Sequence, residues 1–256
     1  MQETVTRLLD GEGEKTATER RVERASCWLG LVAPVVTLGG IFLAAGLSPA
    51  FEWGVNALSD LGRADVAATQ AGVLADPRPS GVSAAAATPT TKLVFNSALL
   101  LGAALGLGFG AALLRTARNR LEFAGVGLFG VALVLMGLVG VFPWPYRLHV
   151  PVAAGFYTFL CVALMVYGAG NVVAGDRVRG GATWLAGAAN GLLWLGWLMT
   201  GGVLAGPLTL QSVVEALVRP GLAYPEILGA LTLAVWAVGT AVVVRRQLGH
   251  GSFSPV

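Results

Sequence analysis

Six long apolar runs, separated by shorter polar segments, account for most of the sequence. A hydrocarbon core about 30 Å thick is crossed by a helix of roughly 20 apolar residues. Each run has about that length, so we expect six transmembrane helices. Their predicted ranges are 25–47, 93–114, 121–142, 149–173, 182–204 and 226–244.

The basic residues are distributed unevenly between the two sides of this arrangement. If the N-terminus is cytoplasmic, 12 lysine and arginine residues lie on its side of the membrane and five lie on the other. Cytoplasmic loops carry an excess of Lys and Arg, and short connections favour antiparallel neighbours. The predicted fold class is therefore an all-α membrane protein, a six-transmembrane-helix up-down bundle with both termini cytoplasmic.

The polar segments divide the chain further. Residues 1–24 are highly charged and are predicted to form a cytoplasmic tail, and residues 247–256 form a second tail after the transmembrane domain at 25–246. On the outer side, residues 63–91 are rich in Ala, Pro, Ser, Thr and Gly, which is typical of a flexible insertion. Residues 210–218 are predicted to form one short interfacial helix.

The composition supports the same class of protein. Hydrophobic residues make up 55% of the chain and charged residues 12%, and the mean hydropathy is +0.71. Soluble domains carry about 25% charged residues. We expect a multi-pass protein of the cell membrane with membrane lipids as partners, and leave open a homo-oligomer or a protein partner. No basic stripe alternates with aromatic residues, so nucleic-acid binding is not expected.

A polar motif, Asn56-Ala-Leu-Ser-Asp-Leu-Gly62, follows the first apolar run. If this segment is helical, Asn56, Ser59 and Asp60 share one face because they are three and four residues apart. The predicted topology brings polar residues of other segments to the same outer layer. Because polar groups near hydrocarbon cost free energy unless they are paired, this layer indicates mutual hydrogen bonding or a binding site. The candidate ligand-binding residues are Asn56, Ser59, Asp60, Asn96, Arg147 and His149, with Glu226 at the same depth.

Part of this layer has the residue types of a hydrolase. His149 could act as base or acid, with Ser59 as its partner and Asp60 or Glu226 orienting the ring. His149, Asp60 and Ser59 are thus the catalytic candidates, although the chain has no Gly-x-Ser-x-Gly elbow. The other histidine, His250, lies in the predicted cytoplasmic tail, so we expect no zinc site. No phosphate-binding loop of the Gly-x-x-x-x-Gly-Lys type occurs, and no cofactor is expected.

Three functions fit this inventory to different degrees. The first is a non-enzymatic membrane protein whose outer polar layer is structural, or binds a lipid headgroup or a partner. The alternative is a membrane-embedded enzyme that acts on a lipid headgroup or acyl ester at the outer leaflet, using His149 with Asp60 or Ser59. A transporter is disfavoured, because the middle of the six runs contains essentially no charged residues.

The motif at 56–62 also carries a resemblance. Together with Phe95-Asn96 and Arg147-Leu-His149, it resembles the DUF998 family of multi-pass membrane proteins, which are found in archaea and bacteria and are distantly similar to the Frag1/DRAM group. The resemblance implies a helical membrane architecture. It implies no particular reaction, because the family has no established activity.

Overall fold

The computed structural model describes residues 25–65, 72–75, 86–205, 207 and 209–249. This part of the chain forms seven α-helices and one 3-10 helix, and it contains no strand. The tail predicted at 1–24 and much of the predicted insertion lie outside the described residues. Of the tail predicted at 247–256, residues 250–256 also lie outside them, whereas residues 247–249 continue the last helix, so that tail begins later than predicted. The elements in chain order are α3 (Leu29–Leu47), η1 (Leu58–Gly62), α5 (Pro89–Thr116), α6 (Arg120–Val141), α7 (His149–Val173), α8 (Arg177–Thr200), α9 (Leu210–Leu217) and α10 (Ala223–Gly249).

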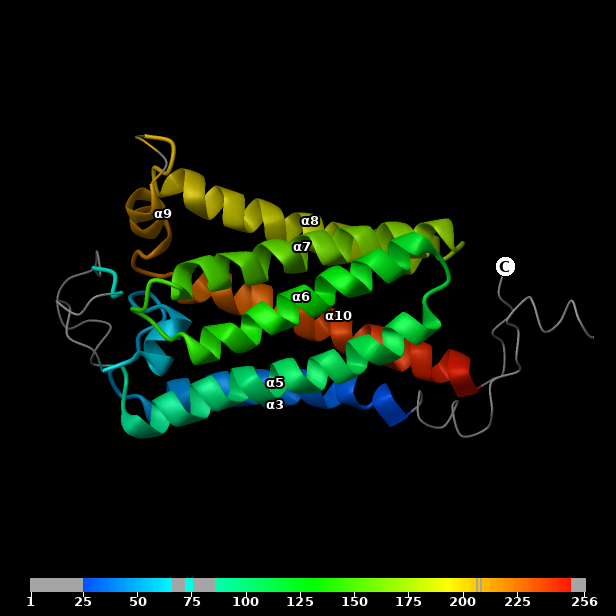
Figure 1. Cartoon of the computed structure of the whole chain (residues 1–256), viewed down its shortest axis with the longest axis horizontal. Helices are drawn as coiled ribbons and strands as arrows, with labels where there is room; N and C mark the ends of the chain where they lie inside the picture. The colour runs from blue at the N-terminus through cyan, green and yellow to red at the C-terminus, as the bar shows by residue number, and fades with distance from the viewer. Residues whose placement is uncertain (1–24, 66–71, 76–85, 206, 208, 250–256) are drawn as a thin grey trace, which may run out of the picture.

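The long helices run side by side along one axis (Figure 1). Each of α3, α5, α6, α7 and α8 packs against the next in the chain, and α10 packs against α3 and α8. The start of α3 and the end of α10 lie at one end of the bundle, called here the terminal end. The opposite end holds η1 and α9 and is called the η1 end.

Five of these helices are long and apolar enough to cross a membrane. They are α3, α5, α6, α7 and α10. Most of their first and last residues lie within a few positions of the ends of the five corresponding predicted runs. The predicted run at 182–204 corresponds to α8, which begins earlier, at Arg177, and ends at Thr200. Its arginines, Thr183 and Asn190 make this helix less apolar than the others. Gly202, with a φ of 77°, follows the end of α8 in a conformation that favours glycine.

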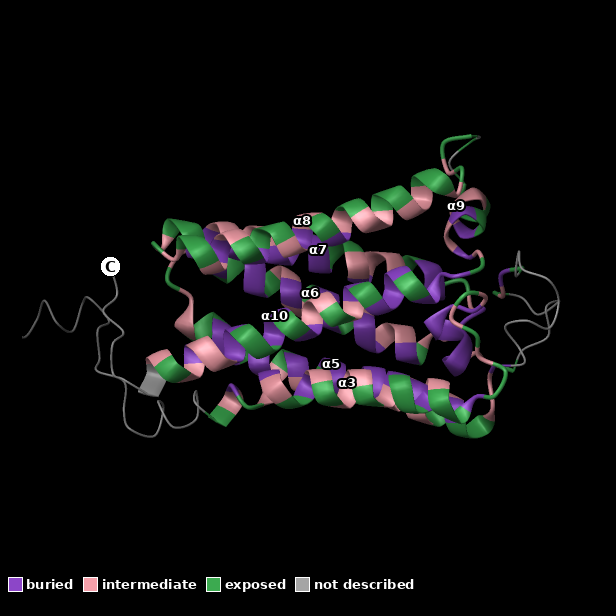
Figure 2. Cartoon of the chain, turned by 180° about the vertical axis from the view of Figure 1, so that it is seen from behind, coloured by how far each residue is buried: buried purple, intermediate pink, exposed green. Residues whose placement is uncertain are grey.

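The outer surface of the bundle is apolar. Large hydrophobic side chains point away from the protein on several helices, and Figure 2 shows exposed residues along the outward faces. The exposed fractions reach 70% at Val35, 69% at Leu93, 68% at Leu192 and 73% at Val235. Apolar surface on this scale is unfavourable in water and suits contact with lipid. The chain is therefore a multi-pass membrane protein.

An aromatic cluster joins α10 to the helices around it. The ring of Trp236 lies 4.9 Å from Phe129, 5.6 Å from Tyr167 and 6.5 Å from Phe109, measured between ring centroids. Two of these pairs are edge-to-face, which is a favourable arrangement for aromatic rings. The cluster brings together α5, α6, α7 and α10 in the interior.

Helices α7 and α8 approach closely because glycines face each other. A Cβ atom added at Gly168 would lie 2.6 Å from the backbone nitrogen of Trp184 and 2.7 Å from the oxygen of Gly180. Small residues of this kind allow helix backbones to come into contact in membranes. Any larger residue at Gly168 would push α8 away.

The described part of the predicted insertion packs on the connection between α6 and α7. The backbone N–H of Leu74 donates to the oxygen of Pro145 at 2.9 Å, and that of Arg147 donates to Gly72 at 2.8 Å. Helix α5 begins inside the predicted insertion, at Pro89, because Thr88 caps it by accepting from Thr91 N at 3.2 Å. The insertion is therefore shorter than predicted at its C-terminal end.

Candidate functional site

The polar motif forms a turn followed by one 3-10 turn. Asp60 is fully buried, and its Oδ2 accepts from Asn56 Nδ2 at 3.1 Å and from the N–H of Ala57 at 2.9 Å. Asn56 Oδ1 accepts from the N–H of Glu52 at 2.8 Å. The carboxylate thus caps the short helix from within its first turn. Asn56 precedes that helix, so it does not share a helical face with Asp60 but bonds to it directly.

Helix α10 holds the motif from one side. The N–H of Leu58 donates to Glu226 Oε2 at 2.6 Å, and the N–H of Ala223 donates to the backbone oxygen of Asn56 at 3.1 Å. Glu226 is itself buried. Tyr157 on α7 donates its hydroxyl to the backbone oxygen of Glu226 at 3.1 Å. Three segments far apart in sequence therefore meet at Glu226.

Helix α5 holds the motif from the other side. Asn96 Nδ2 donates to the backbone oxygen of Gly62 at 3.1 Å. A Cβ atom at Gly62 would overlap the side-chain oxygen of Asn96 and lie 2.7 Å from the ring of Phe95. The motif therefore ends in glycine because α5 passes too close for any side chain. Asn96 acts here as a packing contact.

His149 is the first residue of α7 and is buried. Its Nδ1 lies 2.9 Å from the backbone oxygen of Phe142, and its ring meets Trp144 edge to face at 6.0 Å. A carbonyl oxygen only accepts, so Nδ1 carries the hydrogen and donates. In the neutral ring Nε2 then has a free lone pair. Within the described part of the chain, Nε2 has no hydrogen-bond partner.

Ser59, next to the buried Asp60, also has a free hydrogen-bonding group. Its side chain is 9% exposed, and that of His149 is 5% exposed. Among the described residues, no group donates to the Ser59 hydroxyl or accepts from it. Both side chains line the same internal cavity. Ser59 and His149, each with a free hydrogen-bonding group, therefore line one space.

This cavity lies among α3, α5, α6, α7, α10 and η1. Apart from Thr37, which lies midway along α3, its polar residues gather at the η1 end, where Ser59, His149, Tyr157 and Glu226 line it. The remaining wall is almost entirely apolar. The lining residues of α10 extend from Glu226 to Ala237, which is roughly 16 Å of helix. The space open to the centres of water-sized spheres is about 80 Å³, so the cavity is elongated and has one polar end.

The predicted layer of candidate residues thus separates into three groups. Ser59 and His149, with Glu226, line the cavity. Asn56, Asp60 and Asn96 bond within or onto the motif and do not line it. The side chain of Arg147 is exposed. Among the described residues, Arg147 bonds through its backbone, whose N–H donates to the oxygen of Gly72.

Comparison with known proteins assigns the family. The model of a family described as "Protein of unknown function (DUF998)" matches residues 64–245, which is more than half of the chain. The chain belongs to the DUF998 family. The match begins just after Gly62, so the motif of this DUF998 protein lies outside the matched residues. No curated protein and no solved structure matches the chain.

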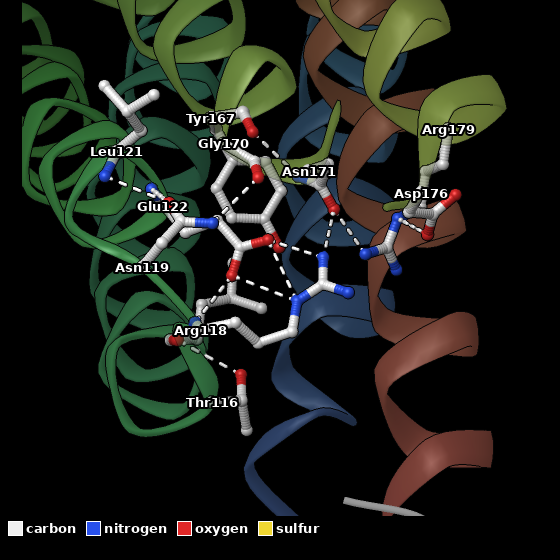
Figure 3. A network of polar contacts seen from close by, with 11 residues as sticks. Thr116, Arg118, Asn119, Leu121, Glu122, Tyr167, Gly170, Asn171, Asp176 and Arg179 are labelled. Carbon is white, nitrogen blue, oxygen red and sulfur yellow. Dashed lines mark hydrogen bonds and ion pairs between the residues drawn. The ribbon is translucent and has the colours of Figure 1, made fainter. Parts of the chain in front are cut away.

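The DUF998 domain also holds a polar network at its terminal end (Figure 3). Arg118 Nε donates to both oxygens of buried Glu122, at 3.1 and 3.3 Å, and its Nη2 donates to Oε1 at 2.5 Å. Asn171 Oδ1 accepts from Arg118 Nη2 at 3.1 Å and from Arg179. Arg179 is paired with Asp176 at 2.9 Å. Burial lowers the pKa of Arg118, but Glu122, with smaller contributions from Tyr167 and Asp176, raises it, and the net pKa is above its ordinary value.

The network was not predicted, although the sequence contains signals for it. Asn119 accepts from the N–H groups of Leu121 and Glu122 at 3.1 and 2.9 Å. An N-cap residue followed three positions later by an acid is a known helix-start pattern. Asn171 is a polar residue near the end of a predicted span, and such residues usually bond to other helices. The network joins the α5–α6 connection to α7 and α8 and is a structural clamp.

Proposed function

We propose that this protein crosses the cell membrane six times, with both termini in the cytoplasm, and binds a lipid in its internal cavity. The sixth crossing is α8, whose 24 residues correspond to roughly 36 Å of helix. The orientation is supported by basic residues at the terminal end. On the described helices and connections of that end they are Arg115, Arg118, Arg120, Arg177, Arg179, Arg245 and Arg246. The polar end of the cavity then lies in the outer leaflet.

The observation that carries lipid binding is the form of the cavity. It is an elongated and mostly apolar space, called here the channel, and its polar end is lined by Ser59 and His149. Among the described residues, Ser59 Oγ and His149 Nε2 have no hydrogen-bond partner. Such a space complements an amphiphile, with the chain in the channel and the head at Ser59 and His149. An unpaired polar group in a buried site costs about 1–3 kcal/mol, and a bound head removes that cost.

A cavity-filling substitution tests the proposal. Ala230 lines the channel one turn after Glu226, so Ala230→Phe would block the channel just below its polar end. The matched control is Ala104→Phe, because Ala104 is exposed on α5 and does not line the cavity. Each protein is purified in a nonionic detergent, and bound lipid is detected by native mass spectrometry. We expect the wild type and the control to retain a lipid that Ala230→Phe loses.

Two results would contradict lipid binding in the cavity. One is a wild-type protein that carries no lipid after mild purification and takes up none when lipid is added. The other is equal lipid retention by Ala230→Phe and Ala104→Phe. A thermal unfolding curve for each variant checks that both proteins are folded, since overpacking usually costs about 1–3 kcal/mol.

A lipid-ester hydrolase is a second candidate, because Ser59 and His149 line the same cavity. The free Nε2 of His149 is the atom that would take a proton from a serine nucleophile. The Nδ1 atom, however, donates to a backbone carbonyl of Phe142, where a serine hydrolase usually has a carboxylate. Hydrolysis of a long-chain ester by the wild type but not by Ser59→Ala would favour this candidate. The relation to the Frag1/DRAM group stays a prediction.

A further inference from the structure

Among the described residues, those that line the polar end of the cavity offer hydrogen-bond acceptors and no cation. None of the lining residues is a lysine or an arginine. Glu226 contributes a carboxylate, and the Nε2 atom of His149 is a lone-pair acceptor because Nδ1 donates to Phe142. The hydroxyl of Ser59 can both donate and accept. The site therefore favours a head that donates a hydrogen bond.

An anionic head would be poorly matched to these groups. A carboxylate or a phosphate would place its lone pairs against His149 Nε2 and its charge near the Glu226 carboxylate. Charges interact strongly in a site away from water, and a buried anion without a cation is costly. Ser59 alone offers a side-chain O–H donor that is free, and one donor does not replace the hydration of an anion.

We propose that the ligand is a single-chain amphiphile whose head donates a hydrogen bond and carries no negative charge, such as a long-chain alcohol or amine. This inference rests on the proposed binding of a lipid in the cavity. A hydroxyl head can donate to His149 Nε2 and accept from Ser59 Oγ at the same time. A single chain suits the elongated apolar wall, whose α10 residues extend along roughly 16 Å of helix.

Binding of four amphiphiles tests the head-group preference. They share one saturated chain and end in an alcohol, an amine, a carboxylate or a phosphate, and they are titrated calorimetrically into the protein in a nonionic detergent at pH 8. We expect the alcohol or the amine to bind at least about 10-fold more tightly than the carboxylate and the phosphate. Equal or tighter binding of either anionic head would overturn the inference.

Two variants locate the preference at the cavity. Ser59→Ala removes one hydrogen bond, and we expect alcohol binding to weaken about 3- to 10-fold. Ser97→Ala is the matched control, because Ser97 lies on α5 and does not line the cavity. Glu226→Gln keeps an oxygen for the N–H of Leu58 and removes the charge, so it should reduce discrimination against the carboxylate head.

The results separate this inference from the function on which it rests. If none of the four amphiphiles and no cellular lipid binds, the proposed function fails. If an anionic amphiphile binds best and Ala230→Phe abolishes its binding, the cavity binds lipids but the head-group preference is wrong. If Ser59→Ala and Ser97→Ala bind the alcohol equally, Ser59 does not contact the head and the proposed recognition is wrong.

Discussion

Replacement of Asp60 by alanine tests whether this carboxylate holds the motif together. Its Oδ2 accepts from Asn56 Nδ2 at 3.1 Å and from the N–H of Ala57 at 2.9 Å, and the residue is fully buried. Asp60→Ala leaves both donors without that acceptor. A buried donor left unpaired costs about 1–3 kcal/mol, so the two together correspond to about 2–6 kcal/mol.

A cost of this size is measurable as a change in thermal unfolding. For 150–250 residues, 1 kcal/mol shifts the Tm by about 2–4 °C, so we expect Asp60→Ala to lower the Tm by at least about 4 °C. Intrinsic tryptophan fluorescence in one detergent and at one scan rate provides the measurement. Asp65→Ala is the matched control, because the Asp65 side chain is 88% exposed and its ion pair with Lys92 is on the surface. Such pairs contribute about 0–1 kcal/mol.

The comparison also bears on the catalytic interpretation of Asp60. A carboxylate kept for chemistry can be removed with little loss of stability, whereas one that satisfies buried donors cannot. If the Tm of Asp60→Ala equals that of Asp65→Ala, the assignment of Asp60 to the structure of the motif is wrong. In that case Asp60 returns to the list of catalytic candidates.

Two further predictions concern the terminal end and the orientation. Glu122→Ala should lower the Tm, because removing one partner of a buried ion pair costs about 3–5 kcal/mol. Glu215→Ala is the control, because Glu215 is exposed, and it should lower the Tm by less. Equal Tm values for the two variants would contradict the role of the network as a clamp. In intact cells, a membrane-impermeant maleimide should label Arg147→Cys, and it should label Arg120→Cys only after the membrane is opened. The reverse pattern of labelling would overturn the orientation.

The membrane helices could be predicted because the apolar run that crosses lipid is itself the signal. The range of α7, at 149–173, was predicted to the residue, and α9 to within one residue. Helix α8 was misplaced by about five residues at its start, because its polar first turns pack at the terminal end beside the network of Arg179 and Asn171. An apolar run marks only the apolar part of a helix, so it does not show that the helix begins in the polar residues before that run.

The candidate site could be predicted only in part. The sequence indicated that Ser59 and His149 lie at one depth, and they do line one cavity. It did not indicate the cavity, because that space depends on how side chains of five helices pack against one another. The sequence analysis also grouped Arg147 with Ser59 and His149. Two residues at the same depth in the membrane can point into the bundle or out of it, and depth alone does not tell which.

The two polar clusters differ in which acceptors remain free, and this difference supports the proposed site at the η1 end. At the terminal end, both oxygens of Glu122 and the side-chain oxygen of Asn171 accept from guanidinium groups. The acceptor oxygens of that cluster are therefore satisfied by the protein itself. At the η1 end, Asp60 accepts from protein donors, but Ser59 and His149 line the channel and have free groups among the described residues. Folding alone does not require two such groups there, because alanine and phenylalanine would line the channel without the cost of unpaired polar atoms.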